Sequence, residues 1–479
     1  LWLPVALWGL SYVRPAYRDK FLLIGLPGYH LLAGAGAIWL AGLARRQWHT
    51  LLASVPVALL LLLPIGVSSC AGLASYYGDR RYARDDYRSL AAFIAAVASP
   101  NDAIILNAPG QMEVFSYYYR GPATVYPLPE QRPPDLPSLT TRLQTLSARH
   151  PRCYLVLWAT AESDPEGQVE AWFDSQAYKA LNRWYGNVRL VTYESPPVSL
   201  STQQAQVTFG GEIALEWYAM GQEPVVPGRA LPIELTWQVL EPVAGRYKLF
   251  IQALDVHSNI VGQRDAEPLS GRKPTDTWRP GETVTDREAV PVLLGTPPGE
   301  YTVIAGLYDP NTGTRLTLPD GSDHLVLGQM KVVASPNRVS TEALRQLAPR
   351  RIGLGPVRLL GWDLGRLGEE PRLEPQLAPG QPLSLILYWR VVEGRPVSLR
   401  FSLERGGQQW ELAERELLQG LFPPAQWQPD QLLRDPHILF LPPDLPAGRY
   451  MLSLTVETEL GAGRVDVGRI QVSAADGSG

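Results

Sequence analysis

The stretch PGRALPIELTWQV at residues 227–239 decides the fold, because it recurs as PGQPLSLILYWRV at residues 379–391. Both copies open on a proline and a glycine and then alternate apolar with polar residues, a pattern that predicts a half-buried β-strand. Since the two copies lie far apart in the chain, the repeat indicates two complete domains rather than a solenoid of short units.

A second pair of matching stretches fixes the class of the repeated domain. PPGEYTVIAGLYD at residues 297–309 matches PAGRYMLSLTVET at residues 446–458. Each copy has several alternating segments between Gly and Pro turns and no helical period, which is the pattern of a β-sandwich. The sequence therefore predicts two β-sandwich repeats, at residues 206–335 and 351–473.

A different pattern precedes the repeats and predicts a small α/β layered domain at residues 82–195. The short apolar runs AIILNA at residues 103–108 and CYLVLW at residues 153–158 are typical of buried strands. Segments with apolar residues at helical spacing alternate with these runs, and they predict helices at residues 85–98, 111–119, 136–149 and 167–181. Such alternation favours a sheet with helices on its faces.

Two long uncharged runs, at residues 21–43 and 51–74, stand near the start of the chain. Each is long enough to cross a bilayer as a helix, and a buried helix hairpin of a soluble fold is the alternative. The chain begins at Leu1 and its first methionine is Met112, which indicates the C-terminal part of a longer protein. The expected fold class is multidomain: transmembrane α-helices at residues 1–75 that end a larger bundle, then the α/β domain, then two β-sandwich repeats.

The composition excludes several classes of function. The net charge is −4 and the chain holds only 2 cysteines among 479 residues. Two cysteines cannot build a disulfide framework or a cysteine-based zinc module, and mixed, mildly acidic charge does not favour a nucleic-acid partner. HExxH, GxSxG and P-loop motifs are absent from the sequence, so we expect no metal, no cofactor and no catalytic residue in this chain.

Polar residues follow the first predicted strand of the α/β domain. Asn107, Gln111 and Glu113 stand where ligands bind in open α/β sheets, so they are candidates to line a cleft. The alternative is a strand-to-helix turn, in which Gln111 and Glu113 occupy the first helical turn near the helix dipole. The residues themselves favour the turn.

The polar and aromatic residues of the repeats allow two further interpretations. Trp278 and Trp427 occupy matching positions and either stack on sugar rings or plug the two cores, which is the commoner use of such a tryptophan. Four aspartates of the first repeat are candidate calcium ligands, but their spacing matches no calcium loop and the second repeat keeps the equivalent of only the last. These aspartates are Asp255, Asp265, Asp276 and Asp286.

Three segments in the same order resemble a known enzyme family. They are RDKFLLIGLP at residues 18–27, DDYRSLAAFI at residues 85–94 and NDAIILNAPGQMEVFSYYYRG at residues 101–121. Together they resemble bacterial members of glycosyltransferase family 39, the protein mannosyltransferase and aminoarabinose transferase type. The resemblance implies transfer of a sugar from a polyprenyl-phosphate donor to an extracytoplasmic glycan, lipid or protein acceptor, with the catalytic loop upstream of this chain.

The resemblance also implies a lipid-phosphate site at the membrane surface. Lys20 stands at the family's arginine position, and Arg14 and Arg18 are neighbouring candidates. A cation there can hold a lipid phosphate. Cations that simply anchor a helix end by snorkelling are the alternative.

The resemblance places the protein in the cell membrane as a multi-pass protein, with membrane lipid as a partner and the soluble domains outside the cytoplasm. The positive-inside rule gives the opposite orientation, because most cations flank the runs on the side of the soluble domains. The alternative function is a non-catalytic, membrane-anchored surface protein whose sandwiches are carbohydrate-binding or adhesion modules. A polysaccharide-assembly component that has lost catalysis is a third hypothesis.

Overall fold

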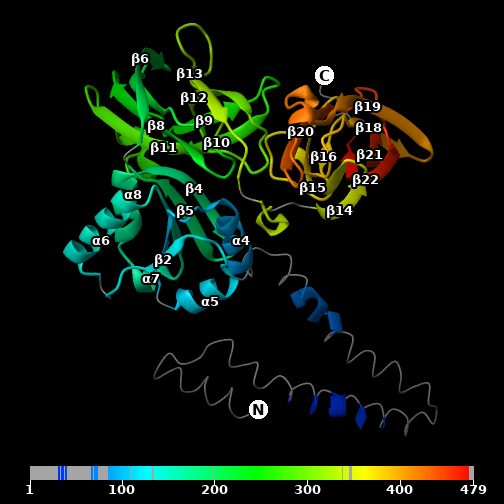
Figure 1. The fold of residues 1–479 in the computed structure, drawn as a ribbon, viewed down its shortest axis with the longest axis horizontal. Coiled ribbons are helices and arrows are strands. Elements are labelled where there is room, and N and C mark those ends of the chain that lie inside the picture. The colour runs from blue at the N-terminus through cyan, green and yellow to red at the C-terminus, as the bar shows by residue number, and fades with distance from the viewer. Residues whose placement is uncertain are drawn as a thin grey trace. The chain divides into compact units, whose positions relative to one another are not determined.

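The computed structural model describes residues 85–108, 110–131, 134–196, 198–336, 338–344 and 348–473, together with short helical pieces within residues 28–42 and 66–73. Asp85–Gly479 forms one compact unit, which is separate from residues 1–84. The fold below is that of the C-terminal unit, drawn in Figure 1.

The first part of this unit is an α/β layer. Its strands stand in the order β2-β1-β3-β5-β4, with β1 parallel to both β2 and β3 and the remaining pairs antiparallel. The strands are β1 (Ala103–Leu106), β2 (Thr124–Pro127), β3 (Arg152–Leu157), β4 (Tyr178–Tyr185) and β5 (Val188–Glu194). The helices are α4 (Tyr87–Val97), α5 (Gln111–Tyr118), α6 (Leu136–Arg149), α7 (Thr160–Ser163) and α8 (Gln168–Gln176).

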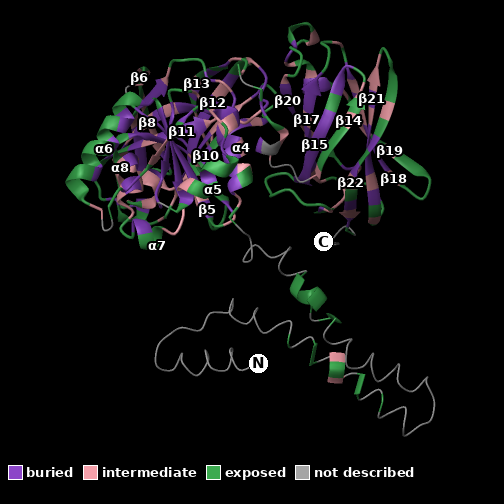
Figure 2. Ribbon diagram, turned by 60° about the horizontal axis from the view of Figure 1, so that its bottom comes forward, coloured by how far each residue is buried: buried purple, intermediate pink, exposed green. Residues whose placement is uncertain are grey.

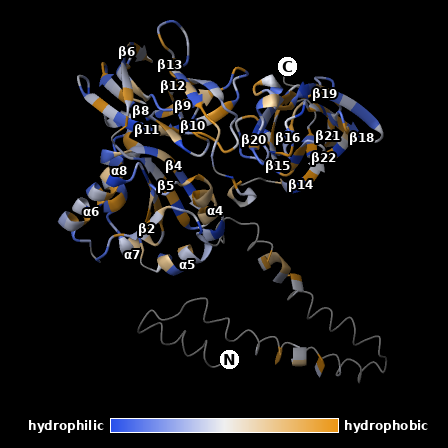
Figure 3. Cartoon of the chain, in the orientation of Figure 1, coloured by the Kyte–Doolittle hydropathy of each residue, from blue (hydrophilic) through white to orange (hydrophobic). Residues whose placement is uncertain are grey.

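Helices cover both faces of this sheet. Leu90 and Ile94 of α4 share a core with one face, whereas Leu143 of α6 and Phe173 of α8 share a core with the other. The outer sides of α6 and α8 are exposed, and hydrophilic residues lie on them among the hydrophobic ones (Figures 2 and 3). Each helix is therefore amphipathic, as its sequence pattern predicts.

The first β-sandwich packs a sheet of order β11-β8-β7-β6 against one of order β10-β9-β12-β13. Its strands are β6 (Leu200–Phe209), β7 (Ile213–Gly221), β8 (Ala230–Val239), β9 (Lys248–Leu254), β10 (Ile260–Ala266), β11 (Thr283–Pro291), β12 (Gly299–Tyr308) and β13 (Leu325–Val332). Alternate residues of β8, among them Ile233, Leu235 and Trp237, are fully buried between the sheets. The prediction of a β-sandwich is confirmed.

The second β-sandwich repeats this arrangement, with sheets of order β14-β15-β17-β20 and β16-β22-β21-β18-β19. Its strands are β14 (Ala348–Leu354), β15 (Val357–Arg366), β16 (Gln376–Leu377), β17 (Pro382–Val391), β18 (Ser398–Arg405), β19 (Gln408–Glu416), β20 (Leu432–Phe440), β21 (Gly448–Thr458) and β22 (Gly461–Val472). Trp389 of β17 occupies the buried position that Trp237 occupies in β8.

A buried aspartate holds the same turn in both sandwiches. Asp286 accepts a hydrogen bond from the Leu269 backbone N–H at 3.0 Å, and Asp435 accepts one from the Leu418 N–H at 3.1 Å. Leu269 and Leu418 both adopt positive φ, at 52° and 59°. Because this backbone region is disfavoured for leucine, the repeated hydrogen bond stabilises a strained turn at matching places. This shared detail supports the predicted duplication.

The α/β layer and the first sandwich share one sheet of nine strands, because β4 pairs with β11. The residues on either side of the predicted boundary at 195–206 therefore belong to one continuous sheet rather than to two sheets. We call the junction between β4 and β11, with the residues that pack against it on either face, the seam.

The predicted helical membrane region needs a correction. In the part of the chain that the structure describes, no helix is long and apolar enough to cross a membrane, and most of that part is β-sheet in several layers. The longest helix of residues 85–479, α6, has 14 residues and a polar face, because it covers a sheet rather than meeting lipid. Most residues of the two predicted spans within residues 1–75 lie outside the described residues.

Candidate binding site at the seam

The residues expected to bind lipid phosphate, Arg14, Arg18 and Lys20, lie outside the described residues. Nothing in the structure bears on their role.

Asn107 and Gln111 are fully buried and bonded to the protein itself. Asn107 donates to Ser163 Oγ at 2.7 Å and accepts from the Trp158 N–H at 2.7 Å. Gln111 accepts from the Ala108 N–H at 2.9 Å and donates to the Val156 carbonyl at 3.2 Å. These bonds tie the end of β1 to β3 and α7, while Glu113 is exposed on α5. The structure thus brings Asn107 and Gln111 together as parts of a strand-to-helix turn, and Glu113 stands apart.

Trp278 and Trp427 are buried in the two sandwich cores. Their indole N–H groups donate to the backbone carbonyls of Lys273, at 3.0 Å, and Phe422, at 2.9 Å. The prediction that they plug the cores is confirmed, and neither ring is placed to stack on a sugar.

The four aspartates considered for calcium do not gather. Asp255 accepts from the Asn259 N–H at 2.8 Å, Asp265 accepts from the Tyr308 hydroxyl at 2.9 Å, and Asp286 holds the Leu269 turn. Within the described residues no group of three His, Cys, Asp or Glu side chains could hold a metal ion.

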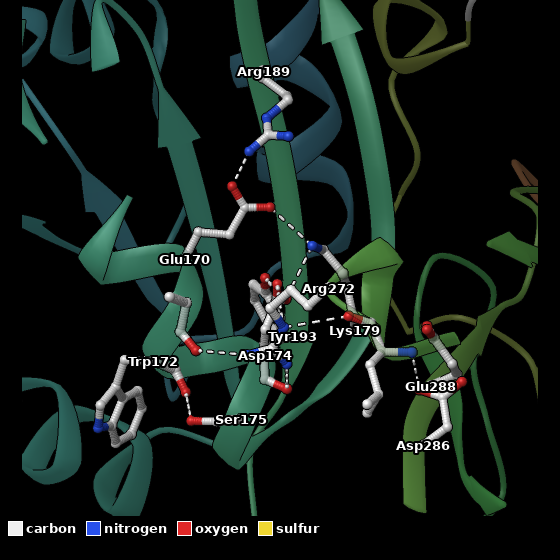
Figure 4. Close-up of polar contacts among 12 residues, drawn as sticks. Glu170, Trp172, Asp174, Ser175, Lys179, Arg189, Tyr193, Arg272, Asp286 and Glu288 are labelled. Carbon is white, nitrogen blue, oxygen red and sulfur yellow. Dashed lines mark hydrogen bonds and ion pairs between the residues drawn. The ribbon is translucent and has the colours of Figure 1, made fainter. Parts of the chain in front are cut away.

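On the α8 side of the seam, charged side chains form a continuous, partly buried network (Figure 4). Lys179 of β4 contacts Glu170 at 2.8 Å and Asp174 at 2.9 Å, both on α8. Glu170 also pairs with Arg189 of β5, and Tyr193 donates to Asp174 at 2.6 Å. The network fixes α8 against β4 and β5.

The start of α8 is fixed by its own sequence. Asp164 accepts hydrogen bonds from the backbone N–H groups of Gln168, at 2.9 Å, and Val169, at 3.0 Å. A carboxylate in this place satisfies N–H groups that have no partner within the helix. This cap sets the position from which Glu170 and Asp174 point to the sheet.

Two acidic residues of β11 extend this network into the sandwich. Glu288 pairs with Arg264 of β10, and Asp286 lies two residues away on the same face of the strand. Both carboxyls are buried, and Asp286 Oδ2 and Glu288 Oε1 have no hydrogen-bond partner among the described residues. Burial raises the pKa of Asp286 well above its ordinary value, and the charge of Glu288 raises it further.

The opposite side of the seam holds a cavity of about 570 Å³. It is bounded by the end of β5, the segment that leads to β6, and the turn between β7 and β8. Its apolar walls include Pro151, Pro224 and Pro232, and its polar lining includes Glu194 and Arg229. Its size falls in the range of small-molecule sites, roughly 300–1,000 Å³, which often form between domains.

Glu194, which lines the cavity, forms a buried ion pair with Arg152, which does not itself line it. Both the Nε and the Nη2 of Arg152 contact the same oxygen, Glu194 Oε1, with Nε at 2.8 Å. Arg152 also donates to the Tyr154 hydroxyl at 2.9 Å and the Gly228 carbonyl at 3.0 Å. Burial alone would lower the pKa of Arg152, but the Glu194 carboxylate raises it above its ordinary range, so the guanidinium stays charged.

The second oxygen of Glu194 is the polar atom that this arrangement leaves for a ligand. The Glu194 side chain is only 10% exposed, and none of its hydrogen bonds to the described residues uses Oε2. Arg229 stands at the cavity wall and reaches Asp102 through Nη2 alone, at 3.2 and 3.3 Å. Arg152 and Arg229 are each paired with a carboxylate, while Glu194 Oε2 and the remaining N–H groups of Arg229 are left for a ligand.

No direct signal in the sequence indicates this site. Arg152 and Glu194 lie 42 residues apart, and each stands at the end of a strand where a charged residue is ordinary. The strand β4, which closes the seam, falls within a segment that was expected to be helical at residues 167–181. Only the pairing of β4 with β5 and β11 shows that the two domains meet there.

No family model matches the chain, and no curated protein matches it. Among solved structures, the C-terminal domain of Wzt is 13% identical, with 27% of this chain and 83% of that chain covered and a TM-score of 0.21. The structure described as BspA_C_WT is 7% identical, with 52% and 97% covered and a TM-score of 0.17. The C-terminal domain of the Streptococcus agalactiae AgI/II polypeptide BspA is 8% identical, with 52% and 96% covered and a TM-score of 0.16.

These values are too low to carry an argument about function, and the resemblance to glycosyltransferase family 39 stays a prediction that no comparison tests. The expected description as a transmembrane glycosyltransferase is corrected, because the described chain is a β-sandwich protein without a membrane-spanning helix. The β-sandwich modules of the alternative hypothesis are confirmed.

Proposed function

We propose that this chain is part of a non-catalytic surface protein that binds glycans, and that the seam cavity is a glycan-binding site. The observation that carries the proposal is Glu194, a buried carboxylate with one oxygen committed to Arg152 and the other left to the cavity. In each of the pairs Arg152–Glu194 and Arg229–Asp102, the positive charge of the arginine is balanced by the carboxylate. A neutral ligand with several hydroxyl groups therefore fits this chemistry better than a charged one.

The placement of the histidines supports a non-catalytic function. His437 lies 2.9 Å from Asp435, but both side chains are fully buried inside the second sandwich, against Phe401. His324 contacts Asp323 in a surface turn. A general base must reach the proton that it abstracts, and His437 cannot reach a substrate in solution.

The test compares two variants of the full chain that add the same bulk at different places. Ser199→Trp puts an indole into the wall of the cavity, whereas Thr202→Trp adds one on the exposed surface of β6. Binding is measured by calorimetry with maltohexaose, cellohexaose and mannohexaose as neutral probes. We expect Ser199→Trp to weaken binding about tenfold or more and Thr202→Trp to leave it unchanged. If Ser199→Trp leaves every class of binding site unchanged, or if no probe binds, the proposal is overturned.

A further inference from the structure

An exposed tryptophan stands on the α8 face of the sheet, at the far end of β4 from the cavity. Trp184 is 58% exposed, although it lies within a strand that pairs with its neighbour along its length. An indole in water is costly compared with a polar side chain at the same place, since its apolar surface stays hydrated. Tryptophan and arginine are enriched among the residues that carry most of the energy of binding interfaces.

The register of the β4–β5 hairpin shows which side chains surround this ring. Trp184 stands opposite Arg189, and Asn182 stands opposite Val191, which belongs to the core beneath α8. Cross-strand partners share a face of the sheet, so Asn182, Trp184 and Arg189 all point to the α8 side. The Arg189 guanidinium lies 5.9 Å from the centre of the Trp184 ring.

Ion pairs with neighbouring side chains hold the polar groups next to the Trp184 ring in place. Arg189 pairs with Glu170, and Glu170 is fixed by Lys179, which is itself fixed by Asp174. The Arg189 and Glu170 side chains keep 23% and 21% of their surface exposed, so both are reachable. A ligand here would meet a carboxylate and a guanidinium that are already oriented, which lowers the ordering cost of binding.

We propose that Trp184, Asn182, Arg189 and Glu170 form a second glycan subsite, which takes a neutral hexopyranose unit. The apolar face of the sugar ring stacks on the indole, and its hydroxyl groups bond to the Glu170 carboxylate, the Arg189 guanidinium and the Asn182 amide. A neutral sugar is favoured because Arg189 and Glu170 compensate each other's charge. The subsite shares its ligand class with the proposed function but is made of different residues on the other face of the sheet.

Trp217 shows why exposure alone does not identify such a site. It is 44% exposed on β7, yet its cross-strand neighbours are Thr236 and Gln204 rather than an ion pair. Trp217 supplies a matched control for Trp184, because both are exposed tryptophans in strands of the same nine-stranded sheet.

The test measures the stoichiometry and affinity of maltohexaose, cellohexaose and mannohexaose binding to the full chain by calorimetry. Trp184→Ala should remove one class of site, Trp184→Phe should retain it because a ring remains, and Trp217→Ala should change neither class. We expect an affinity loss of about tenfold or more at the affected site, as for other central aromatic contacts. Asn182→Ala should weaken the same class of site without altering the other.

The outcomes separate the two proposals. If Trp184→Ala leaves both classes of site intact, or if Trp217→Ala causes the same loss, the subsite is overturned while the cavity proposal stands. If Trp184→Ala removes the binding and Ser199→Trp has no effect, the cavity proposal fails and the subsite stands. If no probe binds the wild-type chain, both fail.

Discussion

Lys179 of β4 and Glu288 of β11 are the one register pair through which the sheet of the α/β layer continues into the first sandwich. The two residues carry opposite charges, and each has further partners in its own half: Lys179 contacts Asp174, and Glu288 contacts Arg264. In the second sandwich the positions that match Arg264 and Glu288 hold Ala413 and His437. The charged residues are therefore specific to the repeat that joins the α/β layer.

Removing the carboxylate of Glu288 should destabilise the compact unit strongly. In Glu288→Leu the Arg264 guanidinium stays buried without a partner, and breaking a buried ion pair in this way costs about 3–5 kcal/mol. The double variant Arg264→Met/Glu288→Leu removes both charges and should recover most of that loss. The free energy of unfolding of the full chain in urea measures both effects. Equal instability of the single and double variants would argue against the ion pair as the cause.

The stability of the seam should depend on pH through Asp286. Its pKa is raised well above the ordinary 3.8 by burial and by the neighbouring Glu288, and Arg264 lowers it in part. A raised carboxyl pKa means that the folded state favours the protonated form. Protonated Asp286 therefore contributes fully to the stability of the folded state at pH values below its ordinary pKa. This contribution is lost as the pH rises through the pKa that Asp286 has in the folded state.

Asp286→Asn is the variant that isolates this effect, because the amide oxygen can still accept the Leu269 hydrogen bond. The variant should gain stability relative to the wild type as the pH rises from about 4 to about 8. Unfolding free energies at several pH values give the difference. A difference that does not change with pH would show that Asp286 keeps its ordinary pKa in the folded state.

The elements that the sequence predicts well are those whose signals are local. Helix α6 has the bounds expected from its pattern, since Asp135 caps its start by accepting from the Ser138 N–H at 3.3 Å and its apolar residues recur at helical spacing. The two sandwiches were visible because the same strand sequence occurs twice. Both signals are contained in short segments and need no knowledge of the tertiary fold.

The seam and its sites could not be predicted because their signals are not local. The first three residues of β4 are buried on both faces, and alternation between half-buried and exposed residues begins only at Leu181, so the strand carries no alternation over its full length. Lys179 and Glu288 lie more than 100 residues apart and each reads as an ordinary surface charge. Their burial becomes evident only when β4 and β11 pair.

The tyrosines that close the two sandwiches should contribute equally to stability. The Tyr301 hydroxyl donates to the Pro297 carbonyl at 2.7 Å, and the Tyr450 hydroxyl donates to the Pro446 carbonyl at 2.6 Å. This is the geometry of the tyrosine corner of Greek-key sandwiches. Tyr301→Phe and Tyr450→Phe should each cost about 1 kcal/mol, because each removes the hydroxyl's hydrogen bond to a proline carbonyl and keeps the ring, while the long contact of 3.4 Å from Arg405 to the Tyr450 hydroxyl adds little. Unfolding in urea measures the loss, and a variant as stable as the wild type would contradict it.

The core tryptophans should affect folding and leave the sugar sites unchanged. Trp278→Ala and Trp427→Ala each remove a buried indole with its hydrogen bond and should cost about 3–5 kcal/mol of unfolding free energy. Trp184→Ala removes an exposed ring and should change stability by less than about 1 kcal/mol. Calorimetric unfolding and glycan binding measured on the same samples separate the two roles. Because Trp278 is buried in the first sandwich, we expect no selective loss of glycan binding. A Trp278→Ala variant that stayed folded and lost only glycan binding would show that the ring belongs to a binding surface.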